Sequence, residues 1–176
     1  MPLRAAGALL ALAIAACTAA ADTRPTGTTR IVARHADWSV VVAETDRGKH
    51  CYAAASPQTR RPEGAVRARA FAFVTTRPTD QVRDEFSVEF GFEAAAGSSL
   101  TVGDETFALA GDAVGAWIRD LADETRLVAA MRSQTHMIIR STSMLGEETL
   151  DTYSLEGFAE ALARARRECA DPTTTS

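Results

Sequence analysis

The sequence predicts a mainly β domain, an antiparallel β-sandwich or a strongly curved sheet, with a short helix and a C-terminal helix packed on it. Three observations predict this class. About eight short segments with strand-type patterns follow one another at close spacing, turn signals separate them, and two segments have helical periodicity. We find no internal repeat, and the length is ordinary for one domain with one core.

Residues 37–44 and 49–56 are expected to form two strands with a turn between them. The first places Trp38, Val40 and Val42 on one face, because side chains alternate between the two faces of a strand. A tryptophan inside such a pattern is expected to anchor the core rather than to bind a ligand.

The next two strands are expected at residues 67–76 and 84–93. The first of these is apolar on both faces in its second half, which predicts a central strand covered on both sides, with a helix against its alanine-rich face. The second has the clearest alternation in the chain. Its inward-facing side chains are expected to be Phe86, Val88, Phe90 and Phe92.

Further strands are predicted in the second half of the domain. Residues 99–110 contain Gly103 and Asp104 between two short apolar runs, a pattern typical of a hairpin. Residues 113–120 predict another strand, in which Trp117 is also expected to be a core anchor.

The short helix is predicted at residues 121–133, where acidic residues in the first turn precede apolar residues at helical spacing. A hairpin with strands at residues 135–143 and 148–154 is expected to follow. Asp151 and Tyr153 in its second strand resemble site residues. We expect them to end the strand instead.

The last helix is predicted to begin after Ser154, a favourable N-cap residue, and to end near the last cysteine. Apolar residues recur on one side of this helix and charged residues on the other. Glu160 and Arg164 have the spacing and order that favour an ion pair. The apolar stripe comprises Leu155, Phe158, Leu162, Ala165 and Cys169.

Residues 1–21 are typical of a signal peptide, because one arginine precedes an uncharged apolar run that is too short to span a bilayer. Three alanines ending at Ala21 fit ordinary signal peptidase, which would release a periplasmic or secreted protein. Cys17 follows Ile-Ala-Ala and fits lipoprotein processing, in which it would be acylated and hold the protein on a membrane. We favour ordinary secretion and keep the lipid-anchored envelope lipoprotein as the alternative.

The rest of the chain is expected to contain one folded domain between two unstructured ends. Residues 22–34 are expected to be a flexible leader, residues 35–170 the β domain, and residues 171–176 a disordered tail. We expect no transmembrane span in the mature chain, because no later segment is apolar for long enough. Loss of one arginine with residues 1–21 changes the net charge from −4 to about −5, so nucleic acid is not an expected partner.

Export would leave Cys51 and Cys169 as the two cysteines of the domain, and pairing is the default in an oxidising compartment. The alternative is a catalytic thiol at Cys51 with the neighbouring His50 as its base. Adjacent residues on a strand point to opposite faces, which disfavours that pair. We therefore expect a disulfide between an early strand and the last helix.

The sequence contains no recognisable catalytic motif. A Gly-rich phosphate loop and a G-x-S-x-G elbow are both absent from it. His35, His50 and His136 lack the spacing of metal ligands, so no metal site is expected. No cofactor is expected either.

Four arginines are concentrated in one segment of this otherwise acidic chain. They could form a patch for an anionic partner such as a lipid head group or a glycan. The interpretation that we favour is a solvated loop that leads into the end of a strand. These residues are Arg60, Arg61, Arg67 and Arg69.

Seven segments, taken together and in their order, resemble the invasion-associated locus B (IalB) family of exported bacterial proteins. They read DWSVVV, CYAAASP, FAFVTTRP, DEFSVEFGF, AWI, LVAAMRS and DTYSLEGFAEAL. The resemblance covers about Trp38 to Cys169, and its most specific part is the S-L-x-G-F-x-x-A-L block from Ser154 to Leu162. It implies a β-rich envelope or secreted domain without an established catalytic activity. Many members carry extra cysteines near the segment that here reads FALAGDAVGAWIRD, which has none, so a second disulfide is not expected.

Two classes of function remain. The first is a non-enzymatic envelope protein that binds a protein, lipid or glycan partner or supports contact with a host. The second is a small exported hydrolase with an unrecognised active site, which predicts a cleft with converging titratable groups and shifted pKa values. The absence of a catalytic motif from the sequence and the family resemblance favour the first.

Overall fold

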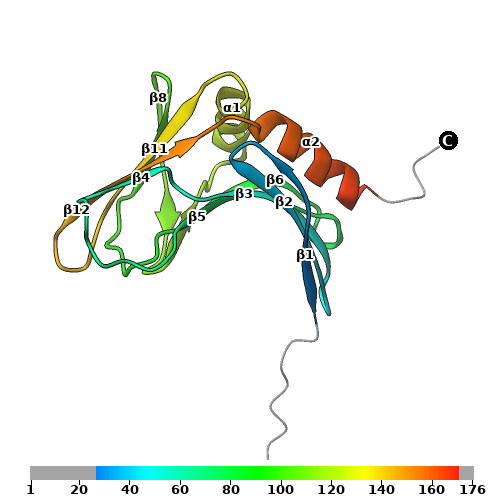
Figure 1. The fold of residues 1–176 in the computed structure, drawn as a ribbon, viewed down its shortest axis with the longest axis horizontal. Coiled ribbons are helices and arrows are strands. Elements are labelled where there is room, and N and C mark those ends of the chain that lie inside the picture. Colours follow the sequence, from blue (N-terminus) through cyan, green and yellow to red (C-terminus); the bar gives the residue numbers. More distant parts are fainter. Residues whose placement is uncertain (1–26, 171–176) are drawn as a thin grey trace, which may run out of the picture.

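The computed structural model describes residues 27–170, which form two antiparallel sheets and two α-helices (Figure 1). The larger sheet has the strand order β1 (Thr28–His35), β2 (Trp38–Thr45), β3 (Gly48–Ala55), β5 (Phe71–Arg77), β6 (Val82–Glu89), β10 (Gly115–Trp117) and β9 (Ala110–Gly111). The smaller sheet has the order β4 (Thr59–Arg61), β12 (Glu148–Ser154), β11 (His136–Thr142), β7 (Ser99–Val102) and β8 (Glu105–Ala108). The helices are α1 (Leu121–Met131), α2 (Phe158–Cys169) and one 3-10 turn, η1 (Pro78–Asp80).

The larger sheet curves into an arch, and α2 lies against its convex face (Figure 1). The predicted fold class, mainly β with a short helix and a C-terminal helix packed on a curved sheet, is therefore confirmed. We call the opposite side of the larger sheet the concave face. Within the described residues, neither α-helix covers it.

The core lies between the convex face of the larger sheet, the two helices and the smaller sheet. Trp38, Val40 and Val42 are fully buried there, as their alternation predicts. The ring of Phe158 in α2 lies 4.8 Å from that of Trp38, measured between centroids. The Trp38 Nε1–H donates to the backbone oxygen of Ser154 at 3.0 Å, so the indole is both packed and hydrogen-bonded.

The predicted start of the domain was wrong. We predicted a flexible leader over residues 22–34, but residues 28–34 belong to β1, which pairs with β2 along its length. The threonines in this segment suggested a linker by composition, yet β-branched residues also favour strands when a neighbouring edge is available. The predicted signal peptide, the rest of the leader and the tail 171–176 lie outside the described residues.

The start of α2 also differs from the prediction. Ser154 ends β12, where its Oγ accepts a hydrogen bond from the backbone N–H of Glu156, and the helix is capped by Gly157. Gly157 has a φ of +82°, and a Cβ at this position would lie 2.1 Å from the backbone oxygen of His35. A glycine is therefore required where the chain turns against the end of β1.

The amphipathic character of α2 is confirmed, because all five residues of its predicted apolar stripe are buried. The ion pair predicted on its polar side, between Glu160 and Arg164, is not the one that forms. Arg164 pairs with Glu168, at 2.7 Å between Nη2 and Oε1, rather than with Glu160.

The predicted central strand, now β5, begins at Phe71 and is covered on one face only. Ala72 and Val74 are buried on the convex face, where the prediction placed a helix. Phe71 and Phe73 are only half-buried and belong to the concave face. The expectation that both sides of this strand are covered was therefore wrong.

The hairpins predicted around Gly103 and between β11 and β12 are both present, as is the short helix α1. Asp120 caps α1 by accepting hydrogen bonds from the backbone N–H groups of Ala122 and Asp123.

Two aromatic side chains are more exposed than predicted. Trp117 ends β10 with 40% of its surface exposed, so it is not the predicted core anchor. Phe86, Val88 and Phe90 are buried as expected, whereas Phe92 lies beyond the end of β6 and is half-buried.

Candidate functional site

The strand register places a row of outward-pointing side chains across the concave face. Trp117 lies opposite Ser87, Ser87 opposite Phe73, Phe73 opposite Ala54, and Ala54 opposite Ser39. Because directly paired residues point to the same side of a sheet, this row runs from β10 to β2 on one face. The small side chain of Ser87 separates the two aromatic ones, and two further small side chains, Ala54 and Ser39, continue the row beyond Phe73.

Three half-buried aromatic rings form the floor of a groove in this face. The ring of Phe73 lies 5.7 Å from that of Tyr52 in an edge-on arrangement and 6.0 Å from that of Phe71. Ile31, which is 52% exposed, extends the apolar surface onto β1. The groove has a volume of about 800 Å³, within the range of ligand-binding sites.

Charged and polar side chains surround these rings. Arg34 donates to Ser39 Oγ at 2.9 Å, and Gln58 donates to Asp37 at 3.2 Å. Arg69 and Glu89 are exposed and form no ion pair within residues 27–170.

The pKa of Tyr52 is raised, mainly by its burial and further by the negative charge of Glu89. Its hydroxyl group therefore remains protonated at neutral pH and can donate a hydrogen bond.

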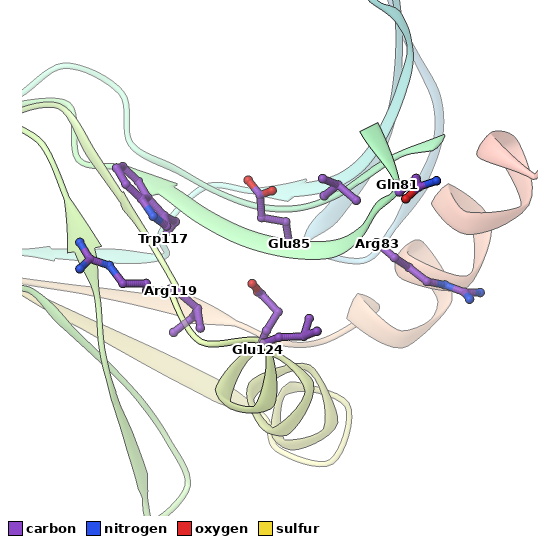
Figure 2. A pocket seen from close by; sticks show the side chains of 9 residues that line it. Gln81, Arg83, Glu85, Trp117, Arg119 and Glu124 are labelled. Carbon is purple, nitrogen blue, oxygen red and sulfur yellow. The ribbon is translucent and has the colours of Figure 1, made fainter. Parts of the chain in front are cut away.

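A second cavity, of about 450 Å³, lies at the edge of β6 next to β10 and α1 (Figure 2). We call it the edge cleft. Glu85 projects into it from β6 and Trp117 from β10, while Glu124 reaches toward the strand from α1 (Figure 2). Trp117 thus lines the edge cleft and also ends the row that crosses the concave face.

Glu124 is 7% exposed, and its carboxylate accepts a hydrogen bond from the backbone N–H of Phe86. The strand β10 pairs with β6 only from Ser87 onward, so the carboxylate occupies the place of the missing strand partner. The pKa of Glu124 is raised to about 7. Burial is the main cause, opposed by the Phe86 hydrogen bond and assisted by the negative charges of Glu85 and Asp84.

The four arginines, for which a patch for an anionic partner was the alternative to a solvated loop, fall into two pairs with different surroundings. Arg60 and Arg67 both bind Asp151, at 3.1 Å and 2.9 Å respectively. Arg60 also donates to two backbone carbonyl oxygens, of Ala68 and Phe90. Of the four, Arg61 and Arg69 are exposed, as a solvated loop would have them, whereas Arg60 and Arg67 are not.

Asp151 is a buried residue in the middle of β12, not the end of a strand as predicted. The alternation in the sequence could have revealed this, because Thr149, Asp151 and Tyr153 share one face of the strand and are all buried. The pKa of Tyr153 is raised, above all by burial. Its hydroxyl group has no hydrogen-bond partner within the described residues.

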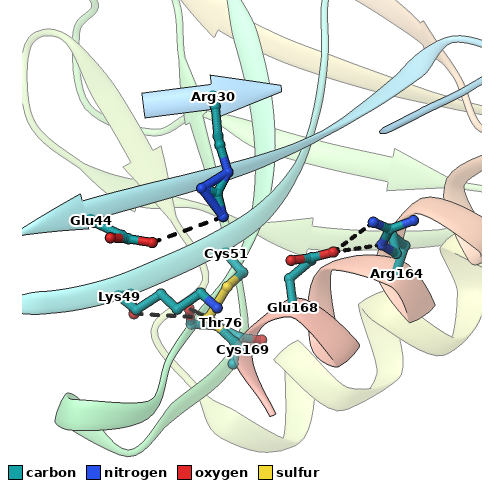
Figure 3. Close-up of a disulfide and its surroundings, with 8 residues drawn as sticks. All are labelled: Arg30, Glu44, Lys49, Cys51, Thr76, Arg164, Glu168 and Cys169. Carbon is teal, nitrogen blue, oxygen red and sulfur yellow. Dashed lines mark hydrogen bonds and ion pairs between the residues drawn. A yellow bond between two sulfur atoms is a disulfide. The ribbon is translucent and has the colours of Figure 1, made fainter. Parts of the chain in front are cut away.

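The predicted disulfide between Cys51 and Cys169 is present and joins β3 to the end of α2 (Figure 3). Cys51 is fully buried, and Cys169 is 6% exposed. A bonded sulfur cannot act as a thiolate nucleophile, so the alternative with His50 as a base does not apply to this state. Cys17, the predicted lipidation site, lies outside the described residues.

Residues 27–170 contain no group of three or more potential metal ligands. His35, His50 and His136 lie on three different strands. Neither α-helix within these residues is long and apolar enough to cross a membrane.

The family model described as invasion associated locus B (IalB) protein matches residues 38–166. That range begins at Trp38 in β2 and ends within α2. It includes the edge cleft, the first disulfide cysteine and the aromatic floor of the groove, but not the groove residues of β1 and the turn after it, such as Ile31 and Asp37. No curated protein and no solved structure matches the chain.

Proposed function

Because the chain belongs to the invasion associated locus B (IalB) family, we propose that it is an exported cell-envelope protein that acts by binding a partner and not by catalysis. The family is not known as one of enzymes. The observation that carries the proposal is the groove of the concave face. It combines half-buried aromatic rings with polar side chains that have hydrogen-bonding capacity to spare.

Export is supported by two features of the chain. The disulfide between Cys51 and Cys169 is of a kind that persists in oxidising compartments and is rare in the cytosol. The first 21 residues have the charge and apolar run of a signal peptide. We propose cleavage after Ala21 and a periplasmic or secreted location, with lipid anchoring through Cys17 as the alternative.

Blocking the groove tests the binding role. Ala54 is half-buried between Ser39 and Phe73 in the row, so an arginine in its place would fill the groove without entering the core. Ala129 is exposed on α1 and lies outside the concave face. We expect purified wild-type protein and Ala129→Arg to co-sediment with isolated envelopes of the source bacterium, and Ala54→Arg to lose most of this association. Equal co-sedimentation of the two variants would refute the assignment of binding to this face.

The alternative function, a small exported hydrolase, has one observation in its favour. Glu124 in the edge cleft has a pKa near 7, as a general acid would, and Glu85 lies nearby. The Phe86 hydrogen bond, however, gives the Glu124 carboxylate a structural role at the strand edge. A hydrolytic activity that Glu124→Gln abolishes while the fold is kept would establish the enzyme and overturn our proposal.

A further inference from the structure

We propose that the concave face binds a neutral, extended oligosaccharide that lies across the strands, with its sugar rings stacked on the aromatic side chains. This inference rests on the proposed function and names the chemical class of its partner. Three observations carry it: the spacing of the aromatic rings, the balance of charge around them, and the state of the backbone beneath them.

The aromatic rings are spaced for a chain of rings. Phe73 on β5 and Trp117 on β10 are separated by one strand, β6, which contributes the small side chain of Ser87. Two strand spacings correspond to roughly 10 Å. A pyranose unit in an extended chain advances by about one strand spacing, so alternate units would meet Phe73 and Trp117.

The C–H groups on the face of a pyranose carry partial positive charge, and the face of an aromatic ring is negative. Stacking is therefore favourable. On the other side of Phe73, Ala54 and Ser39 leave the row open toward β2. Tyr52 and Phe71 widen the stacking surface around Phe73, and the Tyr52 hydroxyl group can donate to the ligand.

The polar groups around the groove suit hydroxyl groups. Two cations, Arg34 and Arg69, and two anions, Asp37 and Glu89, line it together with Gln58. Donors and acceptors are therefore both available, and the charges balance. A ligand with a large net charge would be repelled by one pair as much as it is attracted by the other. A neutral ligand with many hydroxyl groups matches this arrangement.

Two other occupants fit less well. The strands β2, β3 and β5 are each paired on both sides, so the face offers no backbone ladder to an extended peptide, whose own amide groups would lack partners. A lipid acyl chain would bury the charged groups around the groove without hydrogen bonds, which is costly. Stacked sugar rings avoid both problems.

Titration of the purified, disulfide-bonded protein with cellotetraose and with β-1,4-mannotetraose, two neutral chains whose units all carry a vicinal diol, tests the inference. Isothermal calorimetry should show saturable binding of at least one of these neutral chains, with a Kd on the order of 0.1–1 mM. Phe73→Leu keeps an apolar side chain but removes the ring, and should weaken binding about tenfold or more. Phe92→Leu changes a half-buried phenylalanine outside the groove and should leave it unchanged.

Arg69→Ala provides a second variant that cannot disturb the core, because Arg69 is exposed, and it should also weaken binding. The inference is overturned if neither oligosaccharide binds, or if Phe73→Leu and Arg69→Ala both bind as well as wild type.

The chemical nature of the envelope component that binds the protein distinguishes this inference from the proposed function. Periodate cleaves the vicinal diols of sugars. Envelopes treated with it should therefore no longer bind the wild-type protein through the face that Ala54→Arg blocks, while protease-treated envelopes should still bind it. The opposite pattern would overturn the oligosaccharide and leave the proposed function standing, with a protein as the partner. No effect of Ala54→Arg on untreated envelopes would refute the assignment of binding to this face, on which both proposals depend.

Discussion

Removal of the Cys51–Cys169 disulfide is expected to lower the free energy of unfolding by about 3–5 kcal/mol. The perturbation is the double variant Cys51→Ala, Cys169→Ala, since alanine avoids placing a hydroxyl group at two buried positions. A drop of this size is a large fraction of the stability of an ordinary domain, which is about 5–15 kcal/mol. The helix α2 should remain docked, because its apolar stripe is buried independently of the sulfur atoms.

The magnitude follows from the length of chain that the disulfide closes. The two cysteines are 118 residues apart, and the loop-entropy relation gives about 5 kcal/mol at 25 °C for a loop of that size. Residual structure in the unfolded chain reduces this value, because such a chain is already more compact than a random coil. Loss of the two buried sulfur atoms acts in the other direction. The expected range of about 3–5 kcal/mol reflects both effects.

Urea unfolding followed by tryptophan fluorescence measures this change. Trp38 is fully buried against Phe158, so its emission should report the separation of α2 from the sheet. The m-value should rise in the variant, because an unfolded chain without the crosslink exposes more surface. A loss below about 1 kcal/mol with an unchanged m-value would refute the reasoning. Non-reducing peptide mapping of exported protein that finds both thiols free would refute the disulfide itself.

Four further predictions follow from single sites. Phe158→Ala should cost about 3–5 kcal/mol in urea unfolding, because the ring is fully buried, and a loss below about 1 kcal/mol would mean that α2 is peripheral. Asp151→Asn should lower the free energy of unfolding by a similar amount, about 3–5 kcal/mol, because Arg60 and Arg67 would stay charged after losing the carboxylate that neutralises them. A melting temperature equal to that of the wild type would contradict this. The pKa of Glu124 in the folded state, about 7, exceeds its ordinary value of 4.5, so the unfolded chain loses this proton at a lower pH than the folded one. The free energy of unfolding of the wild type should therefore fall by up to about 3 kcal/mol as the pH rises from 4.5 to 7. Glu124→Gln should remove this part of the pH dependence in unfolding titrations, and an unchanged pH profile would refute the assignment. The intact mass of the mature protein should correspond to a start at Asp22, whereas a start at Cys17 with added lipid mass would make this an anchored lipoprotein.

Much of the fold could be predicted because its elements have clear periodicity. The alternation of Trp38, Val40 and Val42 and the stripe of α2 each depend on one buried face, and the sequence records such a face directly. The disulfide could be predicted for the same reason, since Cys169 belongs to that stripe. Boundaries set by tertiary contacts could not be predicted. Gly157 caps α2 because the backbone of His35 passes close to it, and the two residues are far apart in the sequence.

The candidate site was missed because its residues have ordinary local patterns. Phe71 and Phe73 suggested a strand face covered by other elements, and only the arrangement of the sheet leaves them as the floor of a groove. The arginine-rich segment suggested a patch because its partner, Asp151, lies about 90 residues further along the chain. Composition alone cannot distinguish a free cation from one that is neutralised by a distant carboxylate.

The curvature of the larger sheet connects its stability to the proposed binding role. Bulges bend the strands: β1 shifts register between Ile31 and Ala33, and β6 gains a residue near Asp84, whose φ of +60° places it in the left-handed region. A bulge increases twist and bends its strand, so side chains on the concave side converge while those on the convex side separate. Convergence brings the rings of the groove into contact, and separation leaves space for α2 above small side chains such as Ala53 and Ala72. The same bend that seats the helix therefore assembles the groove, and a variant that flattens the sheet should lose both.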